Sequence, residues 1–192
     1  AQLTYDTRDD PLDATEGVFY DLDVTPFAGP DTDSLGARVH VDARTYWALR
    51  GNEGLVFATR ARLGAVEGAG LTEVPPDMLF FSGGAGTVRG QDYQSLGVDL
   101  GGGRQVGGRS FAGISAELRA QVHDEWSVVG FADGAFVGRD SLWDDTGDTH
   151  GGAGVGVRYD TGLGPIRVDI ATPLDSEAGE EFELYIGIGQ AF

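Results

Sequence analysis

The 192-residue sequence contains no cysteine and no lysine, and it has no apolar run long enough for a membrane-spanning helix. The lack of cysteine excludes disulfides, thiolate metal sites and thiol redox chemistry. A membrane helix needs about 20 consecutive apolar residues, whereas the mean hydropathy here is −0.16. Membrane-crossing strands are not excluded, because alternation hides their apolar residues from such an average.

Positive charge is also scarce. The 13 basic residues, all arginines, face 31 acidic residues, and the net charge is −18. Without a basic surface to neutralise phosphates, a nucleic-acid partner is excluded. Most of the arginines fall inside strand-like segments. Since a guanidinium forms fixed, multidentate pairs with carboxylates, this placement favours ion pairs in a confined interior.

Alternation of apolar with polar or small residues is the main pattern present, and it indicates strands with two different faces. The alternating segments are residues 2–9, 18–27, 36–47, 55–66, 111–122, 126–138, 153–160, 166–172 and 182–192. Up to four charges on one face of a strand are too many for a dry core, but they suit a polar lumen. The sequence therefore predicts an all-β fold: a transmembrane antiparallel β-barrel with about eight or nine strands.

The last eleven residues are the clearest predicted strand. One face carries Phe182, Leu184, Ile186, Ile188 and Phe192, and the other carries Glu183, Tyr185, Gly187, Gly189 and Ala191. An aromatic carboxy-terminus on such a strand is typical of outer-membrane barrels. From this segment alone, the last strand of a soluble sandwich is the alternative.

The connections alternate between short and long, and short connections lie on the periplasmic side of such barrels. Trp47 and Trp126 then fall on the apolar face at the periplasmic end, where an aromatic girdle is expected. With nine crossings and a periplasmic Phe192, Ala1 would be extracellular. Either residues 1–9 do not span and eight strands close the barrel, or further strands precede them.

A long connection from Gly68 to Arg109 contains the sequence Phe81-Ser-Gly-Gly84 followed by Val88-Arg89-Gly90. Long connections are usually functional. With these motifs, and with Tyr5–Asp13, Ser115–Glu117, Phe131–Gly134 and Gly156–Ile170, the whole chain resembles the BamA/TamA family of outer-membrane protein assembly factors. Tyr93-Gln-Ser-Leu96 and the ending Ile-Gly-Gln-Ala-Phe resemble the TamA branch, which implies autotransporters among the clients.

The resemblance implies that residues 1–192 form one barrel domain, the carboxy-terminal half of about sixteen strands, in which residues 68–109 fold back into the lumen from the extracellular side. POTRA domains, which the family has in the periplasm, are not present in these residues. The resemblance further implies that Arg89, within Val88–Gly90, is anchored to Glu117 and Asp133. The alternative is that Arg89 only holds a plug-like loop in place. Gln91 stands where the family usually has an aromatic residue, and Gln190 is expected to face outward where an apolar residue is usual.

The implied function is assistance in the insertion, assembly or translocation of outer-membrane proteins in the bacterial outer membrane. A weak seam would let a client strand add to an unpaired edge. The implied seam residues are Phe182, Leu184, Ile186, Gly187, Ile188, Gly189 and Phe192. Expected partners are outer-membrane lipid, client proteins, and either a periplasmic or inner-membrane-anchored protein or further barrel strands. The alternative is a small structural or porin-like barrel that inserts nothing.

Other chemistry has little support in the sequence. His40, His123 and His150 are scattered, and the glycine-rich stretches lack the lysine and helix of a phosphate loop. Asp144, Asp145, Asp148 and His150 lack the spacing of a calcium loop, so we expect solvated loop charge there. The chain is expected to have no enzymatic activity, no cofactor and no metal.

Overall fold

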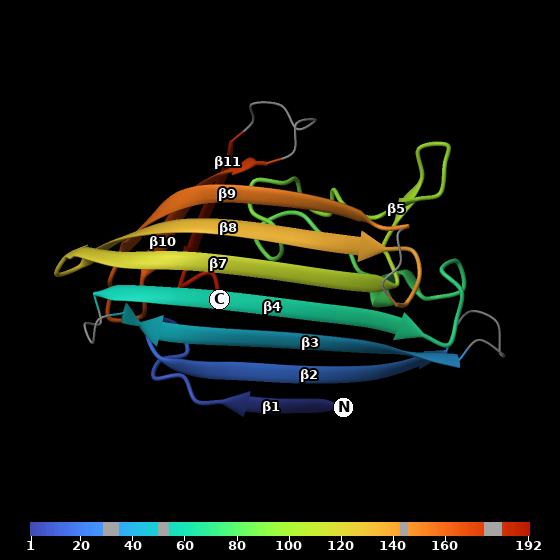
Figure 1. The fold of residues 1–192 in the computed structure, drawn as a ribbon, viewed down its shortest axis with the longest axis horizontal. Coiled ribbons are helices and arrows are strands. Elements are labelled where there is room, and N and C mark those ends of the chain that lie inside the picture. Colours follow the sequence, from blue (N-terminus) through green and yellow to red (C-terminus); the bar gives the residue numbers. More distant parts are fainter. Residues whose placement is uncertain (29–34, 50–53, 143–145, 175–181) are drawn as a thin grey trace.

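The computed structural model describes residues 1–28, 35–49, 54–142, 146–174 and 182–192. Nine strands form one antiparallel sheet in the order β1-β2-β3-β4-β7-β8-β9-β10-β11. Their bounds are β1 Gln2–Asp6, β2 Gly17–Ala28, β3 Leu35–Ala48, β4 Leu55–Glu67, β7 Ser110–His123, β8 Trp126–Gly138, β9 Asp148–Tyr159, β10 Ile166–Pro173 and β11 Glu183–Ile188. The sheet curves, so that β10 and β11 lie behind β8 and β9 in Figure 1.

These strands occupy the nine segments predicted from alternation, which confirms the all-β antiparallel prediction. Three strands differ noticeably from their predicted bounds, and one of them is β11, which is shorter than predicted. β1 ends at Asp6 rather than residue 9, because the side chains of Asp6 and Asp9 accept hydrogen bonds from backbone N–H groups of Arg8 and Thr15 and form a turn. β9 begins at Asp148, earlier than the predicted residue 153.

The sheet is a partial barrel with two open edges among the described strands. β1 pairs with β2, and β11 pairs with β10. Because nine strands alternate in direction, β1 and β11 run the same way, and direct closure would need a parallel pair in an otherwise antiparallel sheet. Of the two alternatives predicted, the closed eight-stranded barrel in which residues 1–9 do not span is not seen among the described strands, because β1 occupies the edge of β2 that would have to pair with β11.

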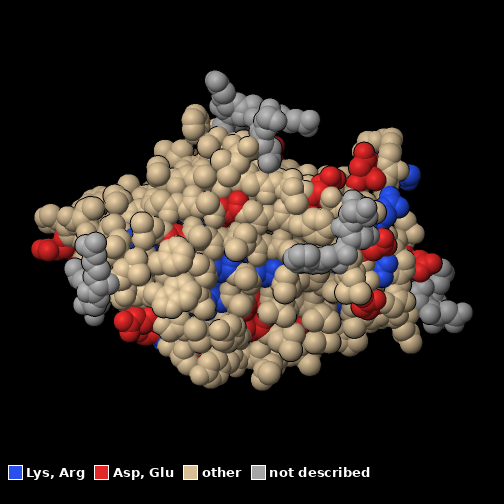
Figure 2. Space-filling model, viewed as in Figure 1, with Lys and Arg blue, Asp and Glu red and all other residues tan. Residues whose placement is uncertain are grey.

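The two faces of the sheet differ as the alternation predicts. On β10, Ile166, Val168 and Ile170 are exposed on the outer face, while Asp169 is fully buried on the inner face. Figure 2 shows uncharged residues over most of the visible surface, with charged side chains at both ends and a smaller number of Asp, Glu and Arg side chains near the middle. An apolar outer band with charged ends suits a sheet that stands in a bilayer.

Exposed aromatic rings lie on the outer face beside the short connections. Trp47 stacks on Phe57 with 5.8 Å between ring centroids, and Trp126 lies 4.8 Å from Tyr159. Both tryptophans are therefore at the short-connection end, as the sequence predicts.

The connection between β4 and β7 folds over the inner face of the sheet. It contains the one-turn helix η2 (Pro76–Met78) and the strands β5 (Val98–Asp99) and β6 (Gln105–Val106). Its apolar residues complete the largest buried cluster, in which Phe80 and Val88 from the loop pack with Val66, Phe111 and Val137 from the strands. Among the described residues no helix is both long and apolar enough to cross a membrane.

Candidate functional site

Arg89 lies at the centre of the inner face, where the β4–β7 loop meets the sheet. Its Nε and Nη2 atoms donate to the two carboxylate oxygens of Asp133 on β8 at 2.7 and 2.9 Å. Its Nη1 atom donates to Glu117 Oε1 on β7 at 2.6 Å. The guanidinium carbon also lies 3.6 Å from the ring centroid of Phe131. The structure thus brings together the three residues that the family resemblance relates, with a bidentate geometry that only arginine provides.

Burial alone would lower the pKa of Arg89, because it disfavours the charged form. Hydrogen bonds and charges from Asp133 and Glu117 outweigh this effect and raise the pKa of Arg89 above its ordinary value. The guanidinium therefore stays charged at every physiological pH, and the loop is held by a permanent ion pair.

The ion pairs continue on both sides of Arg89. Glu117 also accepts from Arg119 at 2.9 Å, and Asp169 on β10 accepts from Arg158 on β9 at 2.5 Å while lying 3.6 Å from Arg89. This buried network contains three guanidinium groups and three carboxylates, so its formal charges cancel. Asp169, Arg119 and Arg158 were not among the predicted site residues, although their inward position on alternating strands was a usable signal.

Glycine at position 90 is required by close approach. Gly90 has a φ of +91°, and a Cβ there would lie 2.6 Å from the backbone of Thr172 on β10. Its N–H group donates to the hydroxyl of Tyr185 on β11 at 2.9 Å. The Val88-Arg89-Gly90 segment therefore contacts β10 and β11 as well as β7 and β8.

Three further polar contacts hold the loop. The guanidinium of Arg62 on β4 donates to the carbonyl oxygens of Gly86 and Thr87 at 2.6 and 3.3 Å. Gln91 donates to the carbonyl oxygen of Gly151 on β9 at 2.8 Å, and His150 and Ser82 are hydrogen-bonded at 2.7 Å. Gln91, which departs from the family pattern, thus uses its amide to bind β9.

The predicted seam strand is shorter than its eleven residues. β11 spans Glu183–Ile188, and Phe182, Leu184, Ile186 and Ile188 are exposed on the outer face. Gly187 lies on the inner face opposite Arg167.

Gly189 and Phe192 do not extend this strand, so that part of the prediction is wrong. Gly189 has a φ of +82°, which turns the chain out of the sheet. Phe192 is consequently only 9% exposed and packs on Ala14, Tyr46 and Ala58, not outward with Ile188. Gln190 also faces inward, where it accepts from Arg158 and donates to Asp13 at 2.8 Å each.

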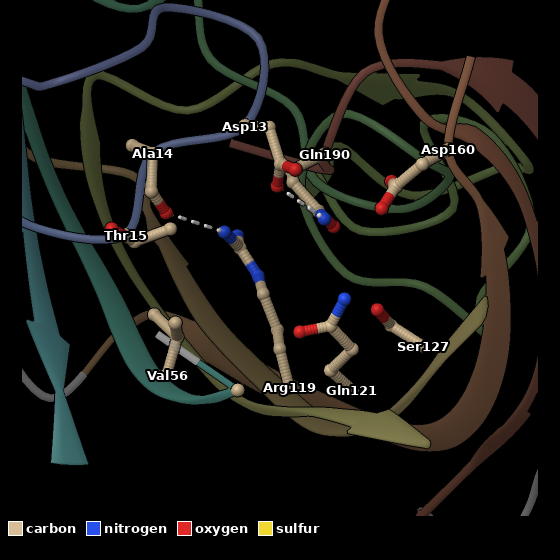
Figure 3. Close-up of a pocket in the computed structure, with 10 residues that line it drawn as sticks. Asp13, Ala14, Thr15, Val56, Arg119, Gln121, Ser127, Asp160 and Gln190 are labelled. Carbon is tan, nitrogen blue, oxygen red and sulfur yellow. Dashed lines mark hydrogen bonds between the residues drawn. The ribbon is translucent and has the colours of Figure 1, made fainter. Parts of the chain in front are cut away.

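A polar cavity of about 190 Å³ opens beside these last residues, at the short-connection end. Figure 3 shows Arg119 rising through it toward the carbonyl oxygen of Ala14, with Gln121 and Ser127 on one side. Arg119 also donates to the carbonyl oxygen of Phe192 at 3.1 Å. The carboxy-terminal residues are thus tied to the same ion-pair network as Arg89.

No group of three or more potential metal ligands occurs among the described residues. Of the acidic loop considered for calcium, Asp144 and Asp145 lie outside the described residues. Asp148 begins β9, and His150 is buried in contact with Ser82.

Residues 1–192 match the family model of the Omp85 superfamily domain. The fold is similar to the crystal structure of BamA from Haemophilus ducreyi lacking POTRA domains 1–3, with a TM-score of 0.77 and 22% sequence identity. The match covers 96% of this chain and 40% of that one, so the present chain spans less than half the length of the BamA chain. Both the all-β barrel fold and the BamA/TamA-type resemblance are confirmed, while the TamA branch stays a prediction. The chain belongs to the Omp85 superfamily, whose members are bacterial outer-membrane proteins concerned with protein assembly or translocation.

Proposed function

We propose that this chain forms part of an outer-membrane barrel that assists the insertion, assembly or translocation of other outer-membrane proteins. The observation that carries the proposal is the free edge of β11, which has no second neighbour among the described strands. Unpaired N–H and C=O groups on such an edge can template a client strand by β-augmentation.

The docked loop would prepare this edge for pairing. Tyr185 projects from β11 and accepts a hydrogen bond from Gly90, the residue next to Arg89. Since Arg89 is bound to Glu117 on β7 and to Asp133 on β8, the loop links the inner face of β11 to the centre of the sheet. An edge held in one conformation loses less entropy when a client strand binds.

The proposal needs no catalytic group and no nucleotide, because strand pairing and lipid contact supply the free energy. Its partners are outer-membrane lipid, client proteins, and either further barrel strands or a periplasmic or inner-membrane-anchored protein. The coverage of 40% of the BamA chain supports further strands. The resemblance to the TamA branch favours autotransporters among the clients.

The test uses the whole protein in liposomes and an unfolded eight-stranded outer-membrane protein as the client. Folding of the client is followed by heat-modifiable mobility. A single cysteine replaces Ile186 on β11 or, as a matched control, Ile114 on β7, and each is labelled with a bulky thiol reagent. The two side chains are 71% and 64% exposed on the same outer face, so they differ mainly in distance from the edge.

We expect the unlabelled protein to accelerate client folding, and label at Ile186 but not at Ile114 to remove the acceleration. A protein that leaves the folding rate unchanged would support the porin-like alternative. Equal inhibition from both positions would mean that the β11 edge is not where clients bind.

A further inference from the structure

Arg167 is an inward-facing residue of β10 that the ion-pair network does not include. Its cross-strand neighbours are Arg158 on β9 and Gly187 on β11. Arg158 is committed to Asp169 and Gln190. Like charges directly opposite each other repel, so the side chain of Arg167 is disfavoured on the β9 side.

The Arg167 side chain instead lies across the inner face of β11. A Cβ placed on Gly187 would be 2.9 Å from Arg167 Nε and 3.5 Å from Nη2. Glycine at this position therefore leaves the space that the guanidinium occupies. Because β11 is an edge strand, the guanidinium lies between β10 and the position of any strand that pairs with β11.

The guanidinium lacks a counterion within the described part of the chain. Its Nε and Nη1 atoms are buried and have no hydrogen-bond partner. The nearest inner-face acid on the same strand, Asp169, already binds Arg158. Arg167 is half-buried as a whole. A partly buried charge without a partner is unfavourable, and a planar guanidinium fork is best matched by a carboxylate.

We propose that Arg167 binds an Asp or Glu side chain on the lumen-facing side of the client strand that pairs with β11. Residues directly opposite each other share one face of a sheet, so the acid is the client residue opposite Gly187. This inference rests on the proposed function and adds a rule of client selection to it. The guanidinium would remain unsatisfied until a client with the correct acid arrives, which makes it a recognition element.

The test uses two synthetic ten-residue peptides that alternate apolar with small polar residues and differ only in one central inward position, Glu or Gln. The whole protein, without other cysteines, carries a single cysteine in place of Ile186, and each peptide carries one cysteine beside the variable position. Disulfide yield in lipid nanodiscs measures pairing with β11. Three protein variants are compared: Arg167→Gln, Arg167→Glu and the control Arg44→Gln on β3. The Arg167→Glu variant is also tested with a third peptide that carries Lys at the variable position. Arg44 also faces inward, but it is bound to Asp42, far from β11 in the strand order.

With Arg167 present we expect the Glu peptide to cross-link roughly tenfold more than the Gln peptide, as for a charged hydrogen-bonded pair. Arg167→Gln should abolish this preference, Arg167→Glu should transfer it to the Lys peptide, and Arg44→Gln should leave it intact. Equal yields for the Glu and Gln peptides would overturn the inference while leaving the proposed function standing. No cross-linking by any peptide would instead contradict strand pairing at β11 itself.

A second measurement separates the client from the barrel's own strands as the source of the acid. The midpoint of heat-modifiable mobility is measured for Arg167→Gln in the absence of any peptide. If the midpoint falls as much as expected for a broken buried ion pair, then the acid that binds Arg167 is a residue of the barrel itself. That result would overturn the inference. An unchanged midpoint together with a lost preference supports it.

Discussion

A side chain at Gly152 on β9 would overlap the carbonyl oxygen of Arg89. The loop backbone therefore passes directly against the sheet at this point, and only glycine allows it. The same segment carries the guanidinium that binds Asp133 and Glu117. The position of Arg89 thus depends on the absence of a side chain at Gly152 as much as on the ion pairs of its guanidinium.

We predict that Gly152→Ala displaces the loop and destabilises the barrel by about 1–3 kcal/mol, the usual effect of overpacking. The matched control is Gly130→Ala on β8, where a Cβ would meet nothing within 4 Å. The midpoint of heat-modifiable mobility and the rate of proteolysis within residues 68–109 would be measured for both. Similar values for the two variants would show that the loop does not pack against Gly152.

The pair of Arg89 with Glu117 can be tested by a double-mutant cycle. Breaking a buried ion pair by removing one partner costs about 3–5 kcal/mol, so Arg89→Ala and Glu117→Ala should each be strongly destabilising. Their effects should be non-additive by about 0.5–3 kcal/mol, the range for residues in contact. Arg89→Lys should restore only part of the loss, because an ammonium cannot form the paired hydrogen bonds to Asp133. Additive effects on heat-modifiable mobility and client assembly would mean that the two residues do not interact.

Much of the fold could be predicted because strand alternation is a local property. Val39 and Val41 alternate with Arg38 and His40 whatever the rest of the chain does, and β3 contains all four. The inward position of Glu117 followed from the same parity. Partners across the lumen could not be predicted in this way, since the approach of Asp169 to Arg89 depends on the curvature of the sheet and on the path of a long loop.

The end of the chain shows where alternation misleads. Gly189 and Phe192 continue the apolar and small pattern of β11, yet the φ of +82° at Gly189 turns the chain inward. The same turn moves Gln190 from its predicted outward position to a contact with Arg158. A glycine in an alternating segment is compatible both with a small inward-facing strand position and with a turn that ends the strand. The sequence alone could not distinguish these two structures.

The outer face should be sensitive to charge. Val41 lies on the outer face of β3, and Val41→Arg should destabilise the protein in lipid by about 2–4 kcal/mol if it lies near the bilayer midplane. Arg44→Gln on the inner face of the same strand should cost much less, because Asp42 keeps its hydrogen bonds to Arg60. Unfolding in liposomes by denaturant would measure both. A larger effect from Arg44→Gln would contradict the assignment of the two faces.

The cavity at the short-connection end should make stability depend on pH through Asp160. Burial raises the pKa of Asp160, and the neighbouring carboxylates of Asp13 and Glu125 raise it further. The folded state therefore holds this proton more tightly than the unfolded state, in which the pKa of aspartate is about 3.9. The associated stability is present below that value and is lost as the pH rises through the folded pKa.

Asp160→Asn removes this titration, so the variant should be more stable than the wild type at neutral pH. The difference should shrink as the pH falls and disappear below about pH 3.9, where the wild-type carboxyl is protonated in both states. The control is Asp124→Asn, an exposed residue of the β7–β8 turn that does not line the cavity. Midpoints of heat-modifiable mobility between pH 3 and 8 provide the measurement. If the stability difference between Asp160→Asn and the wild type instead grew as the pH fell, the prediction would be wrong. That result would show that the fold stabilises the charged form of the Asp160 carboxyl and that repulsion from neighbouring carboxylates does not dominate in the cavity.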